Sequence, residues 1–579
     1  MSIAGKLKDA KSRDDLALLL GYKASSLSYI LYKMAPASKY VEFEIAKRSG
    51  GKRKISAPVP KLKLLQRHLA NILYQYLLDI EKLNKPRRPL SHGFAKSLSI
   101  VTNASVHKRR RYVLNFDLKD FFPSIHFGRV RGVLIKDKRF ELNKDVATAI
   151  AQIACHENSL PQGSPCSPVL SNIVSNILDI RLARLARANK CTYSRYADDL
   201  TFSTNRKEFP SDLAFSDSSS AGKWLLGPAL VKEIEKTGFE INETKTRMQV
   251  RGSRQVTTGL LVNEKVNIRP EYYRNARAMC SSLFTVGSYY RLTPATLADG
   301  KLGDPELKET LTSIAPLEGM VSHIYHVRDK VDQRQSADKK KVTTATRRLY
   351  RKLLFYRHFV NLDEPLILTE GTTDSIYLRS AIERLTDFHP KLGSIVDGKL
   401  KLTIRTMNYT GTVHDVLQIG GGTGDFKHFI LGYKEALKKY RHLPLLFPVI
   451  VLIDNDDGAK DIFSVVKQMG DSTISHKATQ PFFRLHSNLY LIKTPEIGTK
   501  GLSCIEDLFD PTVRATELDG KKFDPNKKHE ELGKYGKTIF AEKIIRPNRA
   551  AIDFGKFALL LNRIIAVVDD HKANPILTT

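Results

Sequence analysis

The fold is decided by a tetrapeptide, Tyr196-Ala197-Asp198-Asp199, which separates two runs of strand-forming residues at 193–195 and 200–203. Strand formers on both sides of this short break predict a hairpin with the acidic pair at its tight turn. Upstream, the apolar run 112–116 ends in a third carboxylate, Asp117. If the three strands are neighbours in one sheet, these carboxylates converge.

Such a cluster is electrostatically costly when it is empty. It becomes favourable when two Mg²⁺ ions, hard cations that prefer oxygen ligands, neutralise it. Two metals about 4 Å apart stabilise both the attacking hydroxyl and the leaving pyrophosphate of a phosphoryl transfer. An Asp-Asp pair by itself is more often an exposed turn, so the metal site depends on the strands around Asp198 and on the other ordered blocks.

Size and charge favour a multidomain protein with a polyanionic partner. The 579 residues exceed one hydrophobic core, at about 150 residues per domain. Lys and Arg number 93 against 61 Asp and Glu, a net charge of +32, in a chain that is 42% hydrophobic and therefore folded. A merely solubilising surface charge is the alternative.

Several blocks, in order, resemble reverse transcriptases. The resemblance implies a right-hand polymerase with fingers, palm and thumb, using dNTPs and two Mg²⁺ ions. It assigns the catalytic metal ligands to Asp117, Asp198 and Asp199. The positions that contact the nucleotide are Lys47 and Arg53 in a basic hairpin turn, the steric gate Phe122, Gln162 and Gly163 in a Leu-Pro-Gln-Gly-Ser-Pro block, and Lys245.

Two further features resemble the retron branch of that family. Asn103-Ala104-Ser105-Val106-His107 matches its NAxxH signature, and Val256-Thr257-Thr258-Gly259 resembles its VTG block with an additional Thr. The resemblance implies a cognate structured non-coding RNA as template and branched msDNA as product. A group II intron-like or other bacterial reverse transcriptase is the alternative.

The basic segment after Pro270 is similar to a thumb. Tyr272, Tyr273, Tyr289 and Tyr290 stand among arginines, and a basic stripe follows at Arg347, Arg348, Arg351 and Lys352. Rings and cations in this mixture favour RNA or hybrid binding. A solvated helix face explains the stripe equally well.

Beyond Asn361, short apolar runs at 365–369, 415–419 and 447–453 alternate with helical patterns and predict parallel strands. The first run ends in Glu370-Gly371 and the last in Asp454-Asn455-Asp456. Carboxylates at the carboxyl ends of parallel strands lie in the crevice where such sheets bind ligands. Acids at strand ends are also common as helix caps, which is the alternative for either motif alone.

Together these motifs resemble a Toprim domain over about residues 362–510, closest to nucleases of the overcoming-lysogenisation-defect type. The resemblance implies that Glu370 acts in acid–base catalysis or as a metal ligand, and that Asp454 and Asp456 hold one or two Mg²⁺ ions. Gly458 comes one residue earlier than in topoisomerases. Residues 503–507 and Lys537 are candidates to complete the site.

We therefore expect a multidomain α+β protein, a right-hand polymerase followed by an α/β Toprim domain with a parallel sheet. The predicted parts are an N-terminal helical segment (1–35), fingers and palm (36–255), a basic thumb and linker (256–360), and a Toprim nuclease effector with a helical extension (361–579). The effector would shut down the host in antiphage defence by cutting cellular RNA or DNA. A Toprim fold that binds nucleic acid without cutting is the rival.

The location that we expect is the cytoplasm. The N-terminus lacks an apolar signal core, and no run reaches the roughly 18 apolar residues of a membrane span. The five cysteines have no paired spacing, which favours free thiols over disulfides or zinc. A homo-oligomer is compatible with the sequence.

Overall fold

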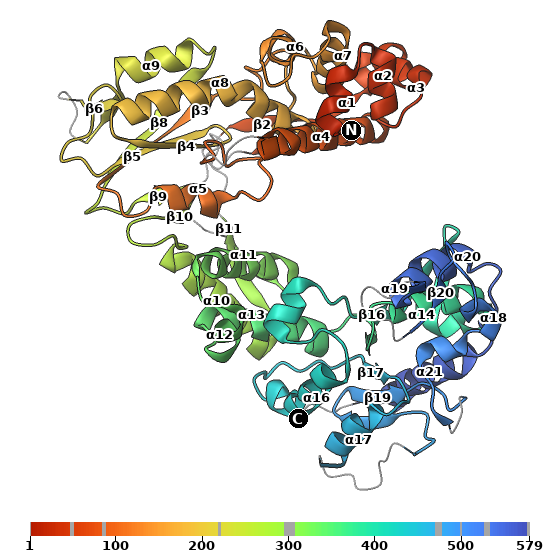
Figure 1. Ribbon diagram of the computed structural model, residues 1–579. Coiled ribbons are helices and arrows are strands. Elements are labelled where there is room, and N and C mark those ends of the chain that lie inside the picture. Colours follow the sequence, from red (N-terminus) through yellow and green to blue (C-terminus); the bar gives the residue numbers. More distant parts are fainter. Residues whose placement is uncertain are drawn as a thin grey trace. The chain divides into compact units, whose positions relative to one another are not determined.

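A computed structural model describes residues 2–46, 51–83, 88–217, 222–293, 307–468, 477–497, 501–525 and 533–575. The chain packs as two units. The first comprises 1–273 with 292–309 and 326–333, and the second comprises 274–291, 310–325 and 334–579. Each unit has its own sheet and its own core, and each is described by itself (Figure 1).

The first unit begins with the short helices expected from the sequence, and a long helix follows a hairpin. Ser12 caps α2 through a capping box with Asp15. The hairpin pairs Tyr40 with Pro58 and Ala46 with Lys52. The elements in this part of the chain are α1 (Ile3–Asp9), α2 (Arg13–Leu19), α3 (Ala24–Ser28), η1 (Tyr29–Lys33), η2 (Pro36–Ser38), β1 (Tyr40–Ala46), β2 (Lys52–Pro58) and α4 (Pro60–Leu83).

The centre of the first unit is a four-stranded antiparallel sheet in the order β4-β5-β3-β8. The predicted neighbours are confirmed, because β3 (Tyr112–Lys119) pairs with β5 (Asp199–Thr204) and β5 pairs with β4 (Thr192–Tyr196). Apolar side chains such as Leu114, Phe116 and Phe202 lie fully buried against the helices that cover the sheet. The other elements are α5 (Ile100–Val106), α6 (Phe127–Lys136), α7 (Lys144–Ala154), α8 (Ser167–Ala188), β6 (Ala214–Ser216), β7 (Trp224–Leu226), α9 (Pro228–Glu235), β8 (Glu240–Val250), β9 (Val256–Thr257) and β10 (Leu260–Leu261).

The middle of the chain contributes residues to both units. Its elements are α10 (Pro270–Val286), β11 (Tyr289–Thr293), β12 (Leu307–Leu311), α11 (Ala315–Val331), α12 (Ser336–Lys341), α13 (Ala345–Phe355) and η3 (Tyr356–Val360). The tyrosines predicted to bind RNA differ in exposure. Tyr289 is buried and donates to the Ser313 carbonyl at 2.8 Å, whereas Tyr272 and Tyr290 are exposed.

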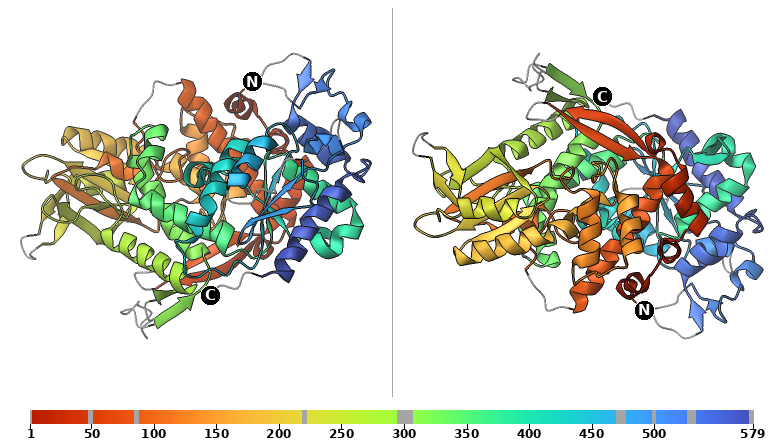
Figure 2. Two further views of the ribbon diagram at one scale, coloured as in Figure 1. Left: turned by 90° about the horizontal axis from the view of Figure 1, so that it is seen from below. Right: turned by 90° about the horizontal axis from the view of Figure 1, so that it is seen from above.

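The second unit contains a five-stranded sheet in the order β16-β13-β17-β19-β18. The predicted strands β13 (Leu366–Thr369) and β17 (Val449–Ile453) are present and parallel, as are β16 (Arg405–Thr406) and β19 (Leu489–Lys493). The edge strand β18 (Phe483–His486) is antiparallel. Helices cover both faces of the sheet (Figures 1 and 2), which makes this unit an α/β layer structure.

One face of the sheet packs on α14 (Asp374–Arg384) and α21 (Phe557–Ala573), with Ile367 and Ile450 in the shared core. The remaining elements of the unit are η4 (Thr386–Phe388), α15 (His389–Leu392), β14 (Gly393–Val396), β15 (Lys399–Leu402), η5 (Val413–Leu417), α16 (Thr423–Leu437), α17 (Ala459–Gln468), η7 (Ile505–Leu508), α18 (Pro511–Arg514), β20 (Lys522–Phe523), β21 (Lys534–Tyr535), α19 (Lys537–Ile539), η8 (Phe540–Ile545) and α20 (Arg546–Asn548).

The strand predicted over 415–419 is wrong. That run forms the π-type helical turn η5, which ends at Gln418 in the left-handed region (φ 60°). The buried guanidinium of Arg347 is 2.7 Å from a carboxylate oxygen of Asp415, and Arg351 donates to the Leu417 carbonyl. A short run with few apolar residues suits either a strand or a helix, and here these contacts with α13 accompany the helical form.

The same contacts change the interpretation of the basic stripe that contains Arg347 and Lys352. Arg347 is buried in an ion pair, and the Lys352 ammonium lies 4.8 Å from the ring centre of Phe284, within the same unit. Neither side chain is a free phosphate ligand. The predicted boundary at Asn361 falls inside the second unit, because α13 and η3 pack there with η5 and α16.

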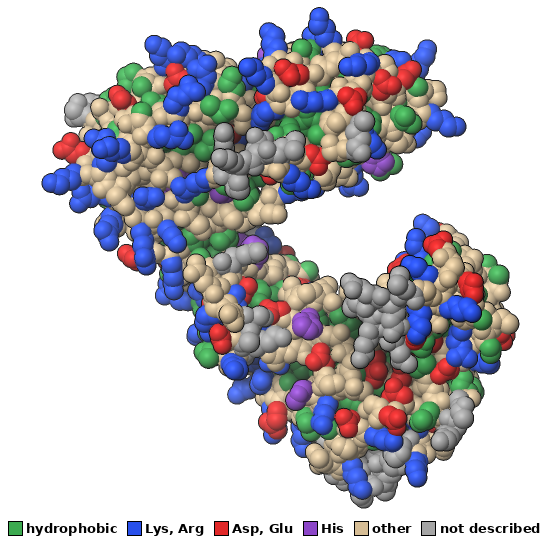
Figure 3. Space-filling model, viewed as in Figure 1, with side chains coloured by type: hydrophobic (Ala, Val, Ile, Leu, Met, Phe, Trp, Pro, Cys, Tyr) green, Lys and Arg blue, Asp and Glu red, His purple; other side chains and the backbone are tan. Residues whose placement is uncertain are grey.

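No helix in the described ranges is long and apolar enough to cross a membrane. Lys and Arg side chains are spread over the visible surface of both units (Figure 3). All five cysteines are free thiols, as the sequence predicts.

Candidate active site

The structure brings the three predicted carboxylates of the first unit together. Asp117 on β3 lies directly opposite Asp199 on β5, and the backbone N–H of Leu118 donates to the Asp198 carbonyl at 2.9 Å. Tyr196 pairs with Asp199, so the turn between β4 and β5 consists of Ala197 and Asp198 alone. Ala197 has a φ of 57°, a conformation that L-residues seldom adopt and that tight hairpin turns require.

The electrostatics of the Asp117, Asp198 and Asp199 cluster favour the binding of cations. Burial, followed by the charges of Asp117 and Asp198, raises the pKa of Asp199 to about 7. Burial and the Asp117 charge also raise the pKa of Asp198. Carboxylates that resist ionisation in each other's presence become ionised when divalent metals bind between them, so the donor set fits Mg²⁺.

Lys245 reaches this cluster through an irregularity in β8. Asn115 pairs with Arg247 and Asp117 with Asn242, so four residues of β8 lie opposite Phe116 alone. The bulge carries the Lys245 ammonium to 2.5 Å from Asp117 Oδ2, and this hydrogen bond raises the pKa of Lys245. The lysine therefore supplies positive charge at the edge of the carboxylate cluster.

A buried ion pair contacts the turn between β4 and β5, and it was not predicted from the sequence. The Arg195 guanidinium on β4 pairs with the Asp179 carboxylate of α8 at 2.7 Å, and both side chains are buried. Arg195 also donates to the Ala197 carbonyl at 2.9 Å. A Cβ added to Gly93 would meet the Ala197 nitrogen at 2.5 Å. The only signal in the sequence is the charge itself, an arginine inside an apolar strand and an aspartate inside an apolar helix.

The NAxxH residues anchor α5 to the strands of the catalytic hairpin. The His107 ring is fully buried, with its nitrogens 2.7 Å from the hydroxyls of Ser203 and Ser194. Ser194 in turn donates to Asn103 at 2.7 Å. Burial lowers the pKa of His107 well below its usual value, so the ring is neutral. These residues position β4 and β5 and lie away from solvent.

The block around Gln162 and Gly163 packs against the strand that carries Arg53. The backbone N–H of Ser56 donates to the Gln162 carbonyl at 2.8 Å. Gly163 has a φ of 123°, and a Cβ there would meet the Ser56 carbonyl oxygen at 2.8 Å, so the close approach requires glycine. Burial and Asp117 raise the pKa of Asp198, and the Arg53 charge offsets a small part of that rise, which indicates positive charge from β2 near the carboxylates.

Phe122 lies beside the carboxylate strand and is half-buried. Its ring is 5.9 Å from the ring of Phe94 and 5.4 Å from that of Phe121. These contacts hold the ring in one place. Lys47, the other predicted nucleotide contact of the hairpin, lies outside the described residues.

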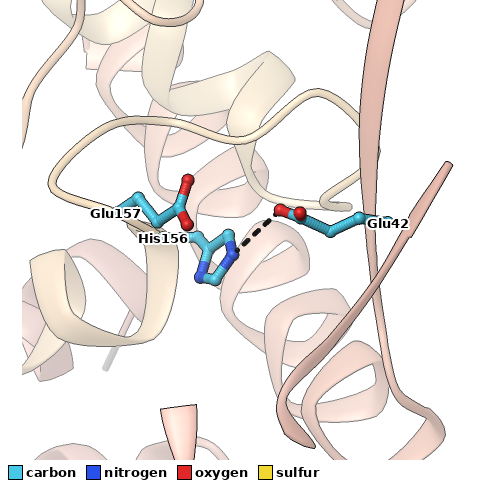
Figure 4. A group of neighbouring side chains, drawn as sticks. All are labelled: Glu42, His156 and Glu157. Atoms are coloured by element: carbon cyan, nitrogen blue, oxygen red, sulfur yellow. Dashed lines mark ion pairs between the residues drawn. The ribbon is translucent and has the colours of Figure 1, made fainter. Parts of the chain in front are cut away.

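Another acidic group near the hairpin is explained without a metal. Among the described residues, the ligand atoms of Glu42, His156 and Glu157 lie within 4.8 Å of one another (Figure 4). The Lys54 ammonium bridges them, at 2.9 Å from Glu42 and 3.3 Å from Glu157. Glu42, Glu157 and Lys54 are exposed and His156 is half-buried, and together they form an ion-pair network that carries its own cation.

The second unit holds a separate cluster at the carboxyl ends of two parallel strands. Glu370 follows β13 and Asp454 follows β17, and these strands pair Thr369 with Leu452. Burial and neighbouring carboxylates raise the pKa of Glu370 to about 7 and that of Asp454 to about 8. Asp374, at the start of α14, is also buried, with its pKa raised to about 6. In the sequence, Asp374 is the last residue of a Glu-Gly-x-x-Asp pattern that begins at Glu370.

Residues later in the chain complete the surroundings of Asp454. The backbone N–H of Ile505 donates to Asp454 Oδ1 at 2.9 Å. The buried Glu506 carboxylate accepts a hydrogen bond from the Lys537 ammonium at 3.0 Å, and its charge raises the pKa of Lys537. Glu506 and Lys537 thus join the cluster, as the sequence suggested, while Cys504 and Asp507 hydrogen-bond to each other.

Asp456 is exposed at the rim of this cluster. Its carboxylate accepts from the Gly458 N–H at 2.8 Å, and its charge contributes to the raised pKa of Glu370. The three consecutive glycines at 420–422 pack against the backbone of the same glutamate, since a Cβ on Gly421 would clash with the Glu370 carbonyl oxygen. All three predicted acids, Glu370, Asp454 and Asp456, therefore belong to one electrostatic group.

The sequence comparisons with known proteins concern less than half of the chain. Residues 45–267 match the family model for reverse transcriptase (RNA-dependent DNA polymerase). The retron Mx65 reverse transcriptase of Myxococcus xanthus is 37% identical over 289 residues, which cover 46% of this chain and 62% of that one. The retron Ec86 reverse transcriptase of Escherichia coli is 34% identical over 251 residues, which cover 42% of this chain and 70% of that one.

Among solved structures, the apo telomerase of Candida tropicalis is similar with a TM-score of 0.29 and 14% identity, over 55% of this chain and 60% of that one. A likeness at this level carries no argument. The sequence relatives do, because the match covers more than two thirds of the Escherichia coli protein at 34% identity. The family-model match over 45–267 contains Asp117, Asp198 and Asp199. The chain belongs to the retron reverse transcriptase family.

Proposed function

We propose that the first unit is an RNA-directed DNA polymerase that copies a cognate retron non-coding RNA into branched msDNA from dNTPs. The observation that carries the proposal is the pairing of Asp117 with Asp199 beside the turn that holds Asp198. These carboxylates would hold two Mg²⁺ ions, which when bound activate the primer hydroxyl and stabilise the leaving pyrophosphate. The family assignment removes the support for the group II intron alternative.

The protein's own side chains then have distinct tasks. Lys245 and Arg53 supply positive charge toward a triphosphate, with Lys47 as a further candidate. The Phe122 ring, held by Phe94 and Phe121, would exclude a ribose 2′-hydroxyl and so select dNTPs. Gln162 and Gly163 would form the floor under the incoming nucleotide.

The test of this proposal is the nucleic acid that copurifies with the full chain. Expressed with the RNA encoded beside its gene, the protein should carry a DNA joined to RNA, and sequencing should map that DNA to the RNA template. Recovery of RNA without attached DNA from the parent chain would contradict it.

We propose as a second function that the C-terminal unit is a Mg²⁺-dependent Toprim nuclease. The supporting observation is a pair of buried carboxylate oxygens that accept no hydrogen bond. In the described part of the chain, Glu370 Oε1 and Glu506 Oε1 are buried without a hydrogen bond. Buried acceptors of this kind suit a cation, and one or two Mg²⁺ ions would be held by Glu370, Asp454 and Asp456.

In the cell, this nuclease would act as the effector of antiphage defence, arresting the host by cutting its RNA or DNA. The rival is a Toprim fold that binds nucleic acid without cutting. Incubating the purified complex with labelled RNA and DNA, with Mg²⁺ or EDTA, separates the two. Cleavage that requires Mg²⁺ and Glu370 supports the nuclease, and intact substrates support the rival.

A further inference from the structure

A second binding feature of the C-terminal unit lies apart from the carboxylates. It is a pocket of about 490 Å³ between α14, the β14–β15 hairpin and α20. Four cationic side chains line it, namely Arg379, Lys399, Arg546 and Arg549. Glu383 is the single carboxylate in the lining.

The charges in this pocket do not balance. Glu383 is engaged by Arg549 at 3.1 Å, and Arg546 pairs at 2.6 Å with Glu542, which does not line the pocket. In the described part of the chain, the side chains of Arg379 and Lys399 have neither an ion pair nor a hydrogen bond, and both are exposed. Cations that converge on one hollow repel each other until an anion enters, so the pocket favours a multiply charged anionic ligand.

The local structure presents these two free cations to the pocket. On α14, Ile376, Arg379, Ser380 and Glu383 share one helical face, whereas Tyr377, Leu378 and Ala381 are buried in the core. Lys399 follows a two-residue turn in which Asp397 and Gly398 have φ values of 51° and 71°. Neither cation packs in the core, and both line the same pocket.

The same helix connects the pocket with the carboxylates. α14 starts at Asp374, which belongs to the carboxylate cluster, and Arg379 follows five residues later. Five residues of α-helix advance about 7.5 Å. A nucleic-acid strand rises about 3.4 Å per nucleotide, so this advance corresponds to roughly two nucleotides.

We propose that this pocket binds backbone phosphates of a nucleic-acid strand whose neighbouring nucleotides reach the carboxylate cluster. The strand as the source of the phosphates rests on the proposed nuclease function, whereas the affinity for phosphate rests on the pocket alone. The contacts are ionic, so they are independent of base sequence.

The test uses amide hydrogen exchange on the full chain, because this measurement reports on the pocket separately from the polymerase. The probes are a 12-nucleotide single strand, as DNA and as RNA, the same DNA with neutral methylphosphonate linkages, and inorganic phosphate at equal phosphate concentration. We expect either charged strand to slow exchange in 374–384 and 540–549. The neutral strand and inorganic phosphate should not.

The variant Arg379→Gln with Lys399→Gln removes the two unpaired charges. Each phosphate contact contributes about −0.7 to the slope of log affinity against log salt concentration. The loss of two contacts should therefore weaken the affinity about tenfold at 0.15 M salt, so protection should require about tenfold more strand. The matched control, Lys434→Gln with Lys467→Gln, removes two exposed charges of the same unit and should change nothing. The thermal unfolding midpoint of each variant checks its folding.

Three results would overturn the proposal. They are equal protection by the neutral strand, protection by inorganic phosphate alone, and protection that survives in the Arg379→Gln, Lys399→Gln chain. Glu370→Gln separates the two ideas, because it should abolish cutting and leave pocket protection intact. If the parent chain cuts nothing and yet shows protection that depends on Arg379 and Lys399, the nuclease proposal fails and the phosphate pocket stands.

Discussion

Asp117 and Asp199 face each other directly across the β3–β5 ladder, and the Lys245 ammonium lies 2.5 Å from Asp117. Because a sheet register fixes this opposition, the two carboxylates cannot move apart without breaking the strand pair. The fold therefore maintains electrostatic repulsion where a metal-dependent polymerase needs affinity for cations.

The first prediction concerns this repulsion. The Asp199 carboxyl has a pKa near 3.9 in the unfolded chain and about 7 in the folded one, so it does not destabilise the fold below pH 4. It destabilises the fold increasingly from pH 4 to 7 and fully above that. Without metal, Asp199→Asn should therefore raise the free energy of unfolding at pH 8 by up to about 4 kcal/mol, and by nothing at pH 4. Urea unfolding in EDTA measures this difference.

The matched control for that measurement is Asp120→Asn, an exposed position at which asparagine tolerates the left-handed backbone (φ 42°). It should leave stability unchanged at both pH values. An Asp199→Asn chain no more stable than the parent at pH 8 would mean that the carboxylates do not repel each other in the folded protein.

The second prediction concerns Lys245. Its ammonium competes with metal for Asp117 but also supplies charge to the triphosphate, so Lys245→Met should change two quantities in opposite directions. The Mg²⁺ concentration for half-maximal synthesis should fall, and the maximal rate should fall by 10- to 100-fold, in the range of about 2 kcal/mol of transition-state stabilisation. Lys119→Met, which removes an exposed ion pair with Glu240 at 3.1 Å, is the control. A Mg²⁺ requirement that stays the same or rises contradicts the competition.

The third prediction concerns the ion pair beneath the turn. Arg195→Met removes the cationic partner of the buried Asp179 carboxylate, which keeps the Tyr193 hydroxyl as a donor, and should cost about 3–5 kcal/mol of unfolding free energy. Adding Asp179→Leu should recover part of that loss, since the isolated charge is gone. Removing the exposed pair of Lys236 with Glu233 should cost at most about 1 kcal/mol. If the double variant is no more stable than Arg195→Met, the ion pair is not what supports the turn.

What the sequence predicted well was local. The Tyr-Ala-Asp-Asp turn and the strands beside it are contiguous, so hydrophobic pattern and residue type were sufficient to predict that hairpin. The same holds for β13 and β17 with Glu370 and Asp454 at their ends. The convergence of Asp117 with the hairpin depended on strand order, which the family resemblance supplied.

What the sequence did not reveal depends on distant contacts. The support of the turn joins Arg195 to Asp179 across a helix and a strand. The strand predicted at 415–419 became η5 in contact with Arg347, 68 positions away. The same pairing accounts for a basic residue that had suggested phosphate binding, because charge in a sequence does not tell whether a carboxylate awaits it within the fold.

The fourth prediction separates the two carboxylate clusters. Glu370→Gln should leave DNA synthesis unchanged and abolish nuclease activity, host toxicity and phage protection. Asp457→Asn alters an exposed neighbour paired with Lys460 and should preserve all of them. Loss of DNA synthesis in Glu370→Gln would mean that the second unit supports the polymerase structurally.

The nuclease should also depend on pH through its metal. Protons compete with Mg²⁺ for Glu370 and Asp454, whose pKa values are raised to about 7 and about 8. The Mg²⁺ concentration for half-maximal cleavage should therefore rise as pH falls below 7, by about tenfold per pH unit for each carboxylate that must deprotonate. A Mg²⁺ requirement independent of pH between 6 and 8 would rule out these ligands.

The most direct test of the account is RNA-templated primer extension by the purified full chain, comparing the parent with Asp199→Asn in the presence of Mg²⁺. The account predicts labelled DNA from the parent with dNTPs, little product with ribonucleotides, and a loss of at least about 1,000-fold in Asp199→Asn, with RNA binding retained. DNA synthesis by Asp199→Asn at the parent's rate would show that the carboxylates of β3 and β5 are not the polymerase site.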